Sequence, residues 1–204
     1  IKDKLVKTCD NQGMIGKAPL LLLFLADFQR WMDYIEASEV KDFNKENNFE
    51  EYIPKEGDMF LAINDALIAA QTTVLAAEDF GLGSCYIGDI MENFEIHKEL
   101  FNLPKYTLPI TMLCIGYPTE QQKNRTMRRR YFSKDMIVHK NSYRKPSVEE
   151  FKAMDKEIAE KDSSVFLPGC HNQAIHMYKR KITSDFMSEM NRSVKAMIDS
   201  WMED

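Results

Sequence analysis

The sequence predicts an α+β fold in which a mixed β-sheet lies between helices. Two short apolar segments, residues 19–27 and 107–117, have the length and composition of strands that are covered on both faces. A longer apolar segment, residues 58–80, contains few helix-breaking residues and predicts one long central helix. Helices are therefore expected on both faces of the sheet.

The overall composition is that of a globular protein. Of the 204 residues, 44% are hydrophobic and 29% are charged, which excludes disordered and fibrous classes and allows one substantial core. A net charge of −5 disfavours a protein that coats nucleic acid, since that binding depends on cations that neutralise phosphates. We expect one domain over residues 1–204, in which residues 146–204 form a C-terminal helical arm.

The longest continuous apolar run, residues 19–26, is far shorter than the roughly 20 residues that cross a bilayer. It ends in Asp27 and not at a small-residue cleavage site, so a signal peptide is also disfavoured. We expect no transmembrane helix, no membrane partner and a cytoplasmic location.

The cysteines and histidines form no metal or redox motif in the sequence. The four cysteines lack the CxxC or Cys/His spacing of a zinc site or redox pair. His171 and His176 are five residues apart, and helical zinc ligands are four apart. We therefore expect reduced thiols, surface or capping histidines, and no metal.

The predicted central helix has plausible signals at both ends, with Asp58 as its N-cap and Gly81 as the residue that stops it. Its side chains are apolar almost all the way round, apart from a thin polar seam. A helix of this kind is buried in a core or in a subunit interface. One chain of this size rarely surrounds a helix completely, so we favour a homodimer interface along one side of it.

The other segments are less distinctive. Pro146 is followed by Ser147, which predicts a capped helix with acidic residues in its first turn. Further elements are expected in these places: helical structure in 1–17, a short helix within a polar excursion at 31–57, a helix of about 10 residues before Pro104, an edge strand at 136–139 and an amphipathic helix at 183–202.

A glycine-rich segment follows the predicted central helix at residues 81–89. It is not a dinucleotide fingerprint, because that motif follows a strand and opens a helix, whereas these glycines follow a helix and enter a strand. Glycines here would let the backbone around Tyr86–Asp89 approach a planar ligand and offer it N–H donors. The alternative is a helix stop with a tight entry into a strand.

A basic run at residues 123–130 carries five cations in eight residues of an otherwise acidic chain. Arginine binds phosphate bidentately, so a phosphate or diphosphate is the natural ligand; a solvated loop is an equal alternative. A weaker basic patch lies at Lys179-Arg180-Lys181. No nucleophile motif or P-loop is present, so we expect no catalytic side chain and a cofactor that carries any chemistry.

The chain resembles the nitroreductase family of FMN oxidoreductases, and most closely its larger NADPH-dependent nitroreductase and flavin reductase branch. The matching segments occur in the family's order over nearly the whole chain. They are LLLFLADFQRW at 21–31, ALIAAQTTVLAAEDFGLGSCYIGDIMEN at 66–93, LPKYTLPITMLCIGYP at 103–118, MIVHKNSY at 136–143 and SDFMSEMNRSVKAMIDSW at 184–201.

This resemblance implies a homodimer with the 58–80 helix at its centre and FMN bound at the subunit interface. It places the flavin ring against residues 86–89, namely Tyr86, Ile87, Gly88 and Asp89. It assigns the FMN phosphate to Arg128 and Arg130, and contacts with NADPH to Lys179, Arg180 and Lys181.

The activity that the resemblance implies is transfer of hydride from NAD(P)H through FMN to nitroaromatics, quinones or free flavin, which are small planar acceptors. The physiological acceptor and the choice between NADPH and NADH stay open. Nucleic-acid binding through residues 123–130 is disfavoured by the net charge.

The chain departs from the family at its front. Members begin with an Arg-Ser-x-Arg type segment that binds the flavin phosphate and pyrimidine edge, and this chain begins at Ile1 without one. We therefore expect that the N-terminal part of the family domain is missing. The alternative function is a truncated, non-catalytic dimeric homologue with weak or no flavin binding.

Overall fold

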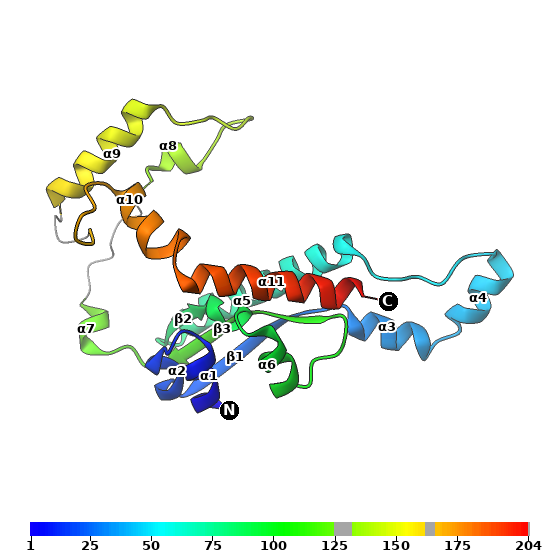
Figure 1. Cartoon of the computed structure of the whole chain (residues 1–204). Helices are drawn as coiled ribbons and strands as arrows, with labels where there is room; N and C mark the ends of the chain where they lie inside the picture. The colour runs from blue at the N-terminus through cyan, green and yellow to red at the C-terminus, as the bar shows by residue number, and fades with distance from the viewer. Residues whose placement is uncertain (125–131, 162–165, 204) are drawn as a thin grey trace. The chain divides into compact units, whose positions relative to one another are not determined.

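The computed structural model describes residues 1–124, 132–161 and 166–203 (Figure 1). The chain forms two compact units. The first consists of Ile1–Thr119 together with Ser188–Asp204, and the second is Glu120–Met187. The predicted C-terminal arm, residues 146–204, therefore contributes residues to both units.

The first unit is built on a three-stranded sheet of β1 (Leu20–Asp27), β2 (Gly83–Ile87) and β3 (Thr107–Gly116), in the order β1-β3-β2. Both pairings are antiparallel, so the sheet has no parallel pairing within the described residues. The α+β fold class and the two predicted strands are confirmed. β3 is central and buried along almost its whole length, whereas β1 at the edge is half-buried.

One face of this sheet is covered by two short N-terminal helices, α1 (Lys2–Thr8) and α2 (Gly13–Lys17). Alternate side chains of a strand point to the same face of a sheet, and on β3 these are Met112 and Cys114. The core that joins helices and sheet here consists chiefly of Leu5, Cys9, Ile15, Ile87, Ile90, Met112 and Cys114. The helical structure predicted for residues 1–17 is thus present, and it forms half of the sheet's covering.

The opposite face is covered by α5 (Glu56–Asp79), with Met197 and Trp201 of α11 (Asp185–Met202) joining the same core. The helix side that meets the sheet consists mostly of alanines, namely Ala62, Ala66, Ala70 and Ala77. These small side chains let the helix backbone lie close to the strands. Between Phe24 and Leu25 of β1 the pairing skips Ile110 of β3, and this bulge keeps Leu108 and Ile110 of β3 in the core on this face.

The ends of α5 follow from local hydrogen bonds. Asp58 is not the N-cap, as predicted, but the third residue of the helix, and its carboxylate accepts a 2.9 Å hydrogen bond from the N–H of Lys55. At the other end Gly81 has φ 72°, and the N–H groups of Gly81 and Leu82 donate to the carbonyls of Glu78 and Ala77. This Schellman pattern confirms Gly81 as the helix stop.

The polar excursion contains two helices, α3 (Gln29–Glu36) and α4 (Val40–Asn47), where one was predicted. Neither helix buries a side chain. Several aromatic side chains of this excursion are exposed: Trp31, Tyr34, Phe43, Phe49 and Tyr52. After β2 come a single 3₁₀ turn, η1 (Gly88–Met91), and α6 (Phe94–Leu100), which is shorter than predicted.

The second unit is helical in its described residues. It contains α7 (Glu120–Lys123), α8 (Lys134–Ile137), α9 (Val148–Lys161), α10 (Gln173–Met177), a π-helical turn η3 (Tyr178–Ile182) and the first residues of α11. Ser147 caps α9 as predicted: the Ser147 N–H donates to the Glu150 carboxylate, and the Glu150 N–H donates to the Ser147 hydroxyl.

The edge strand predicted for residues 136–139 is wrong. Met136 and Ile137 belong to α8, and the N–H of Val138 donates to the carbonyl of Lys134. The backbone groups here are satisfied within one helical turn, so they need no neighbouring strand.

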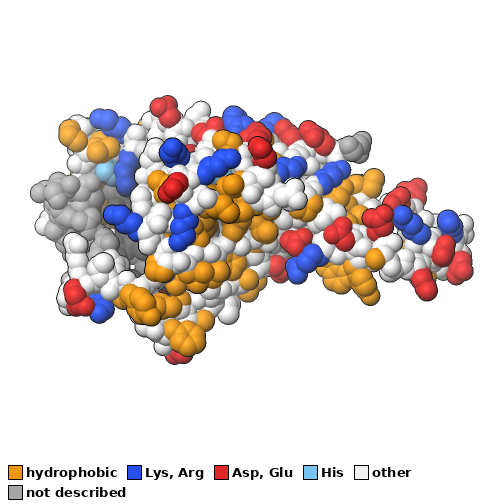
Figure 2. All heavy atoms as spheres, turned by 90° about the horizontal axis from the view of Figure 1, so that it is seen from below, with side chains coloured by type: hydrophobic (Ala, Val, Ile, Leu, Met, Phe, Trp, Pro, Cys, Tyr) orange, Lys and Arg blue, Asp and Glu red, His pale blue; other side chains and the backbone are white. Residues whose placement is uncertain are grey.

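The outer side of α5 is strongly apolar and exposed. Its exposed large side chains are Phe60, Leu61, Leu67, Ile68 and Leu75, and Figure 2 shows how densely hydrophobic side chains gather on one face of the molecule. α5 is also long and apolar enough to cross a membrane by length and composition alone, contrary to the expectation that no segment would be. Its alanine side, however, packs on the sheet.

Replacing Gly81 by alanine is expected to lower the free energy of unfolding by about 1–2 kcal/mol, because a Cβ is strained at positive φ. Urea unfolding would measure this. The matched control is Gly57→Ala in the same helix, where an added Cβ meets nothing within 4 Å. That substitution should be neutral or stabilising by up to about 1 kcal/mol, and equal losses for both would contradict our account.

Candidate functional site

The sequence-predicted flavin segment lies at the edge of the sheet, where β2 ends and η1 begins. β2 pairs only with β3 within the described residues, so its other edge is open. Tyr86 points to the α5 side of the sheet and is exposed, and its hydroxyl lies 3.2 Å from Oε1 of Gln71. The side chain of Ile87 is fully buried in the core beneath α1 and α2. Only the backbone of Ile87 can therefore meet a ligand.

Gly88 is the first residue of η1, and a Cβ built on it would meet nothing within 4 Å. Its φ is not in the left-handed region. Among the described glycines, Gly81 and Gly169 have a positive φ. Neither the fold's packing nor its backbone geometry therefore requires glycine here. Open space over a glycine backbone is the arrangement that a planar ring needs to approach N–H groups closely. Asp89 follows in the same turn and is half-buried.

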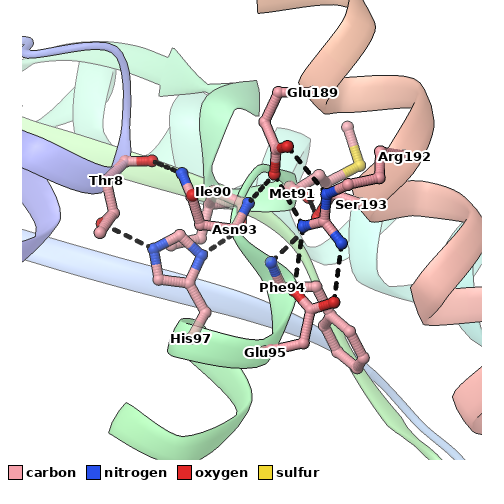
Figure 3. A network of polar contacts seen from close by, with 10 residues as sticks. All are labelled: Thr8, Ile90, Met91, Asn93, Phe94, Glu95, His97, Glu189, Arg192 and Ser193. Carbon is pink, nitrogen blue, oxygen red and sulfur yellow. Dashed lines mark hydrogen bonds and ion pairs between the residues drawn. The ribbon is translucent and has the colours of Figure 1, made fainter.

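Beneath this turn lies a network of polar contacts that joins α1, α6 and α11 (Figure 3). His97 is at its centre and is 0% exposed. Its Nδ1 lies 2.8 Å from the carbonyl oxygen of Ile90 and its Nε2 lies 2.8 Å from Oγ1 of Thr8. A carbonyl can only accept, so Nδ1 carries the proton, and the neutral ring accepts from Thr8 at Nε2. Burial lowers the pKa of His97 below its ordinary value.

Ser193 ties the same turn to α11. Its hydroxyl donates to the carbonyl of Met91 at 2.6 Å and accepts from the N–H of Phe94 at 2.9 Å. Ser193 is 0% exposed, so loss of either bond would leave a buried backbone group without that partner. The N–H of Asn93 donates to Glu189 at 3.1 Å, which adds a second attachment to α11.

At the surface Arg192 joins two acids, Glu95 on α6 and Glu189 on α11. Hydrogen bonds from Arg192 hold the pKa of each carboxyl group below its ordinary value. All three side chains are substantially solvent-exposed, so solvent screens the attraction and the pair adds little stability. Its geometric effect is to keep α6 and α11 together over the network.

The other predicted site residues are not described within the unit that contains β2. Arg128 and Arg130 lie outside the described residues. Lys179, Arg180 and Lys181 belong to η3 in the second unit. Lys179 donates to the carbonyl of Pro168, Lys181 lies 4.3 Å from the centre of the Phe186 ring, and Arg180 is exposed.

Sequence reasoning missed the network beneath the turn. It expected His97 at the surface or at a helix end, and the structure buries it because Thr8 and Ile90 satisfy both ring nitrogens. A signal was present: Phe94, His97 and Phe101 recur at helical spacing on one side of the predicted helix. The contact with Ser193 bridges about a hundred residues and carries no local signal.

Three of the four cysteines lie in the core beneath α1 and α2. Cys85 and Cys114 are directly opposite each other on β2 and β3, and Cys9 belongs to the same cluster. Burial raises the pKa of all three thiols, that of Cys9 to about 12. A thiol with a raised pKa is a poor nucleophile, so these side chains act as packing residues.

The lowered pKa of His97 predicts how stability changes with pH. In the unfolded state His97 binds a proton below about pH 6.5, whereas burial disfavours protonation of the ring in the folded state. The free energy of unfolding is therefore highest above that pH and falls as the pH drops. The maximum slope for one proton is about 1.4 kcal/mol per pH unit. Urea unfolding of the chain and of His97→Asn between pH 5 and 8 would measure this. The difference in slope should appear only below about pH 6.5, and parallel curves would contradict the assignment.

Comparison with known proteins gives the family. A family model described as the nitroreductase family matches residues 2–117, more than half of the chain. An oxygen-insensitive NADPH nitroreductase of Salmonella typhimurium is 28% identical over 160 residues, which cover 78% of this chain and 60% of that protein. An NAD(P)H-dependent FMN reductase of Bacillus subtilis is 33% identical over 144 residues, 70% of this chain and 53% of that protein. The chain thus spans between half and two thirds of their lengths.

Solved structures show the same fold. NfrA2 of B. megaterium superposes with a TM-score of 0.73 at 25% identity, covering 98% of this chain and 75% of that one. The NADPH:FMN oxidoreductase of Vibrio harveyi, solved with NAD⁺, gives 0.70 at 20% identity, covering 97% and 74%. At that identity the second likeness shows the fold alone. Since the family model covers the whole sheet, α5 and the turn after β2, this chain belongs to the nitroreductase family.

Proposed function

We propose that the protein is an FMN-dependent oxidoreductase that passes hydride from NAD(P)H to nitroaromatics, quinones or free flavin. The observation that carries this proposal is the open backbone at Gly88 next to exposed Tyr86, which lies on a sheet edge without a neighbouring strand in the described part of the chain. The relatives support it, since they are named as an NADPH nitroreductase and an FMN reductase. The choice between NADPH and NADH and the physiological acceptor remain outside the proposal.

In this proposal the residues at the end of β2 hold the flavin ring. Backbone groups from Tyr86 to Gly88 would contact the ring, and Asp89 would complete the segment. Bound FMN would supply the redox chemistry, by taking up hydride and releasing it to the acceptor. The chain's own contribution is position. Ile87 fixes the strand by burying its side chain, and no side chain needs to act as acid or base.

Two basic segments complete the proposed site. Arg128 and Arg130 would bind the FMN phosphate, because guanidinium groups match phosphate oxygens bidentately. Lys179, Arg180 and Lys181 would bind NADPH, and of these Arg180 is exposed. We also propose that residues 1–204 form a single nitroreductase-like domain.

We further propose that a second copy of the chain covers the outer side of α5, giving a homodimer in the cytoplasm. Five large apolar side chains are exposed on this helix, more than a monomer's surface normally leaves uncovered in one place. Asn64, Asp65 and Gln71 interrupt the apolar side near the helix centre, where a lipid environment would penalise them. A protein partner can satisfy such groups, so we favour the dimer over a membrane.

The flavin proposal predicts that the purified chain, incubated with FMN and freed of excess cofactor, keeps flavin absorption bands that bleach when NADPH is added. Gly88→Leu should weaken FMN binding at least tenfold, because the new side chain fills the open space that the ring would occupy. Its unfolding midpoint should stay close to that of the unmodified chain, since a Cβ added at Gly88 meets no described atom within 4 Å. Equilibrium titration followed by absorbance would measure both proteins.

Gly57→Leu is the matched control for Gly88→Leu, because Gly57 also has nothing within 4 Å of an added Cβ and lies away from the β2 edge. It should bind FMN like the unmodified chain. A colourless unmodified chain would support the non-catalytic homologue instead. Equal FMN binding by Gly88→Leu and the unmodified chain would remove the flavin from this segment.

The dimer proposal predicts that Ile68→Glu yields monomers. Ile68 is 65% exposed on the outer side of α5, and a buried, unpaired carboxylate in the interface would weaken association by several kcal/mol. Sedimentation velocity across a range of concentrations would measure the change. The control is Ile182→Glu, a similarly exposed apolar residue on η3. If the unmodified chain sediments as a monomer at all concentrations, the dimer proposal is wrong.

A further inference from the structure

The turn that follows the proposed flavin segment is held by side chains from two helices. The carbonyl of Ile90 accepts from His97, and that of Met91 accepts from Ser193. The N–H of Phe94 donates to Ser193, and that of Asn93 donates to Glu189. Four backbone groups between Ile90 and Phe94 are thus held by side chains of α6 and α11, as Figure 3 shows.

A third helix, α1, contacts His97 through Thr8. Oγ1 of Thr8 lies 2.8 Å from His97 Nε2 and 3.1 Å from the carbonyl oxygen of Lys4. The backbone carbonyl of Thr8 also accepts from Nδ2 of Asn93 at 2.9 Å. One threonine therefore contacts both the ring that holds Ile90 and the side chain of Asn93, so α1 is joined to the turn at two points.

The hydroxyl of Thr8 can serve either protonation state of the ring. With neutral His97 its hydrogen points to Nε2. With charged His97 it points to the Lys4 carbonyl, and the oxygen accepts from the ring N–H. The hydrogen bond between Thr8 and His97 is therefore kept in both states, and valine, which has the same shape but no hydroxyl, would abolish it in both.

We propose that Thr8, His97 and Ser193 are positioning residues for the flavin, which hold the backbone between Ile90 and Phe94 and thereby set the adjoining backbone that faces the ring. The inference rests on the proposed flavin function and adds residues that touch no cofactor themselves. The physical reason is that binding sites need their contacting groups held to a fraction of an ångström by surrounding hydrogen bonds. Gly88 has no side chain to anchor it, and its backbone lies between buried Ile87 and the residues that this network holds.

The test compares Thr8→Val, Thr8→Ser and Thr72→Val with the unmodified 204-residue chain. Thr72→Val is the matched control, because Thr72 also lies in a helix and donates to the carbonyl four residues earlier, but on α5. Hydrogen exchange of the amides at 88–94, without flavin, reports on the turn. The FMN dissociation constant and the visible band of bound FMN report on the site.

We expect Thr8→Val to speed exchange at residues 88–94 by about tenfold, to weaken FMN binding by a similar factor, about 1.4 kcal/mol, and to shift the flavin band at saturation. Thr8→Ser keeps a hydroxyl at this position, so its FMN dissociation constant should stay within about twofold of that of the unmodified chain. Thr72→Val should change none of the three readouts. His97→Asn keeps a donor for Ile90 but loses Thr8, so it should repeat the Thr8→Val result if that variant fails to fold.

The outcomes separate this inference from the function that it builds on. If the unmodified chain does not bind FMN, the proposed function fails, while hydrogen exchange still shows whether Thr8 holds the turn. If Thr8→Val and His97→Asn leave exchange at 88–94 unchanged, the positioning role is overturned. The same holds if exchange rises but FMN affinity and the flavin band match those of the unmodified chain.

Discussion

The structure depends above all on the complete burial of β3. This strand pairs with β1 along almost its whole length and with β2 over its second half, and it is covered on both faces, so its side chains need apolar partners on two sides. That double demand explains why α1 and α2 are needed on one face and α5 on the other. It also explains why β1 and β2, which each have one neighbouring strand among the described residues, are more exposed.

The two sides of α5 meet opposite requirements. Alanines on the inner side bring the helix axis close to the strands, and they leave the large apolar residues on the outer side. The same helix therefore completes one core and leaves an apolar side exposed. A helix that is apolar all round satisfies both demands, and this explains why its composition meets the length and hydrophobicity of a membrane span while one side is packed against a sheet.

The candidate site shows where sequence reasoning reached its limit. Tyr86, Gly88 and a short strand beside them were predicted from glycine spacing and from the family resemblance. The structure places Tyr86 on the outer strand β2 and Gly88 in the turn that follows it. The support beneath them was not predicted. Thr8 and Ser193 are ordinary small polar residues whose partners lie 85 residues or more away, apart from the contact of Thr8 with Lys4. His97 was expected outside because a histidine gives no local sign that both its nitrogens will find partners.

The sequence by itself determined the elements whose cause is local. Apolar runs defined β1 and β3, Gly81 ended α5 because only glycine is relaxed at positive φ, and Ser147 capped α9 through a residue three positions away. The local pattern gave the wrong element at residues 136–139, where a short apolar run fits a strand and a helical turn almost equally well and the structure has the helical turn. Only the tertiary structure decided which side of α5 meets the sheet, that the described strand pairings are antiparallel, and that His97 is buried. Each of these depends on contacts between distant segments, and such contacts leave no fixed spacing in the sequence.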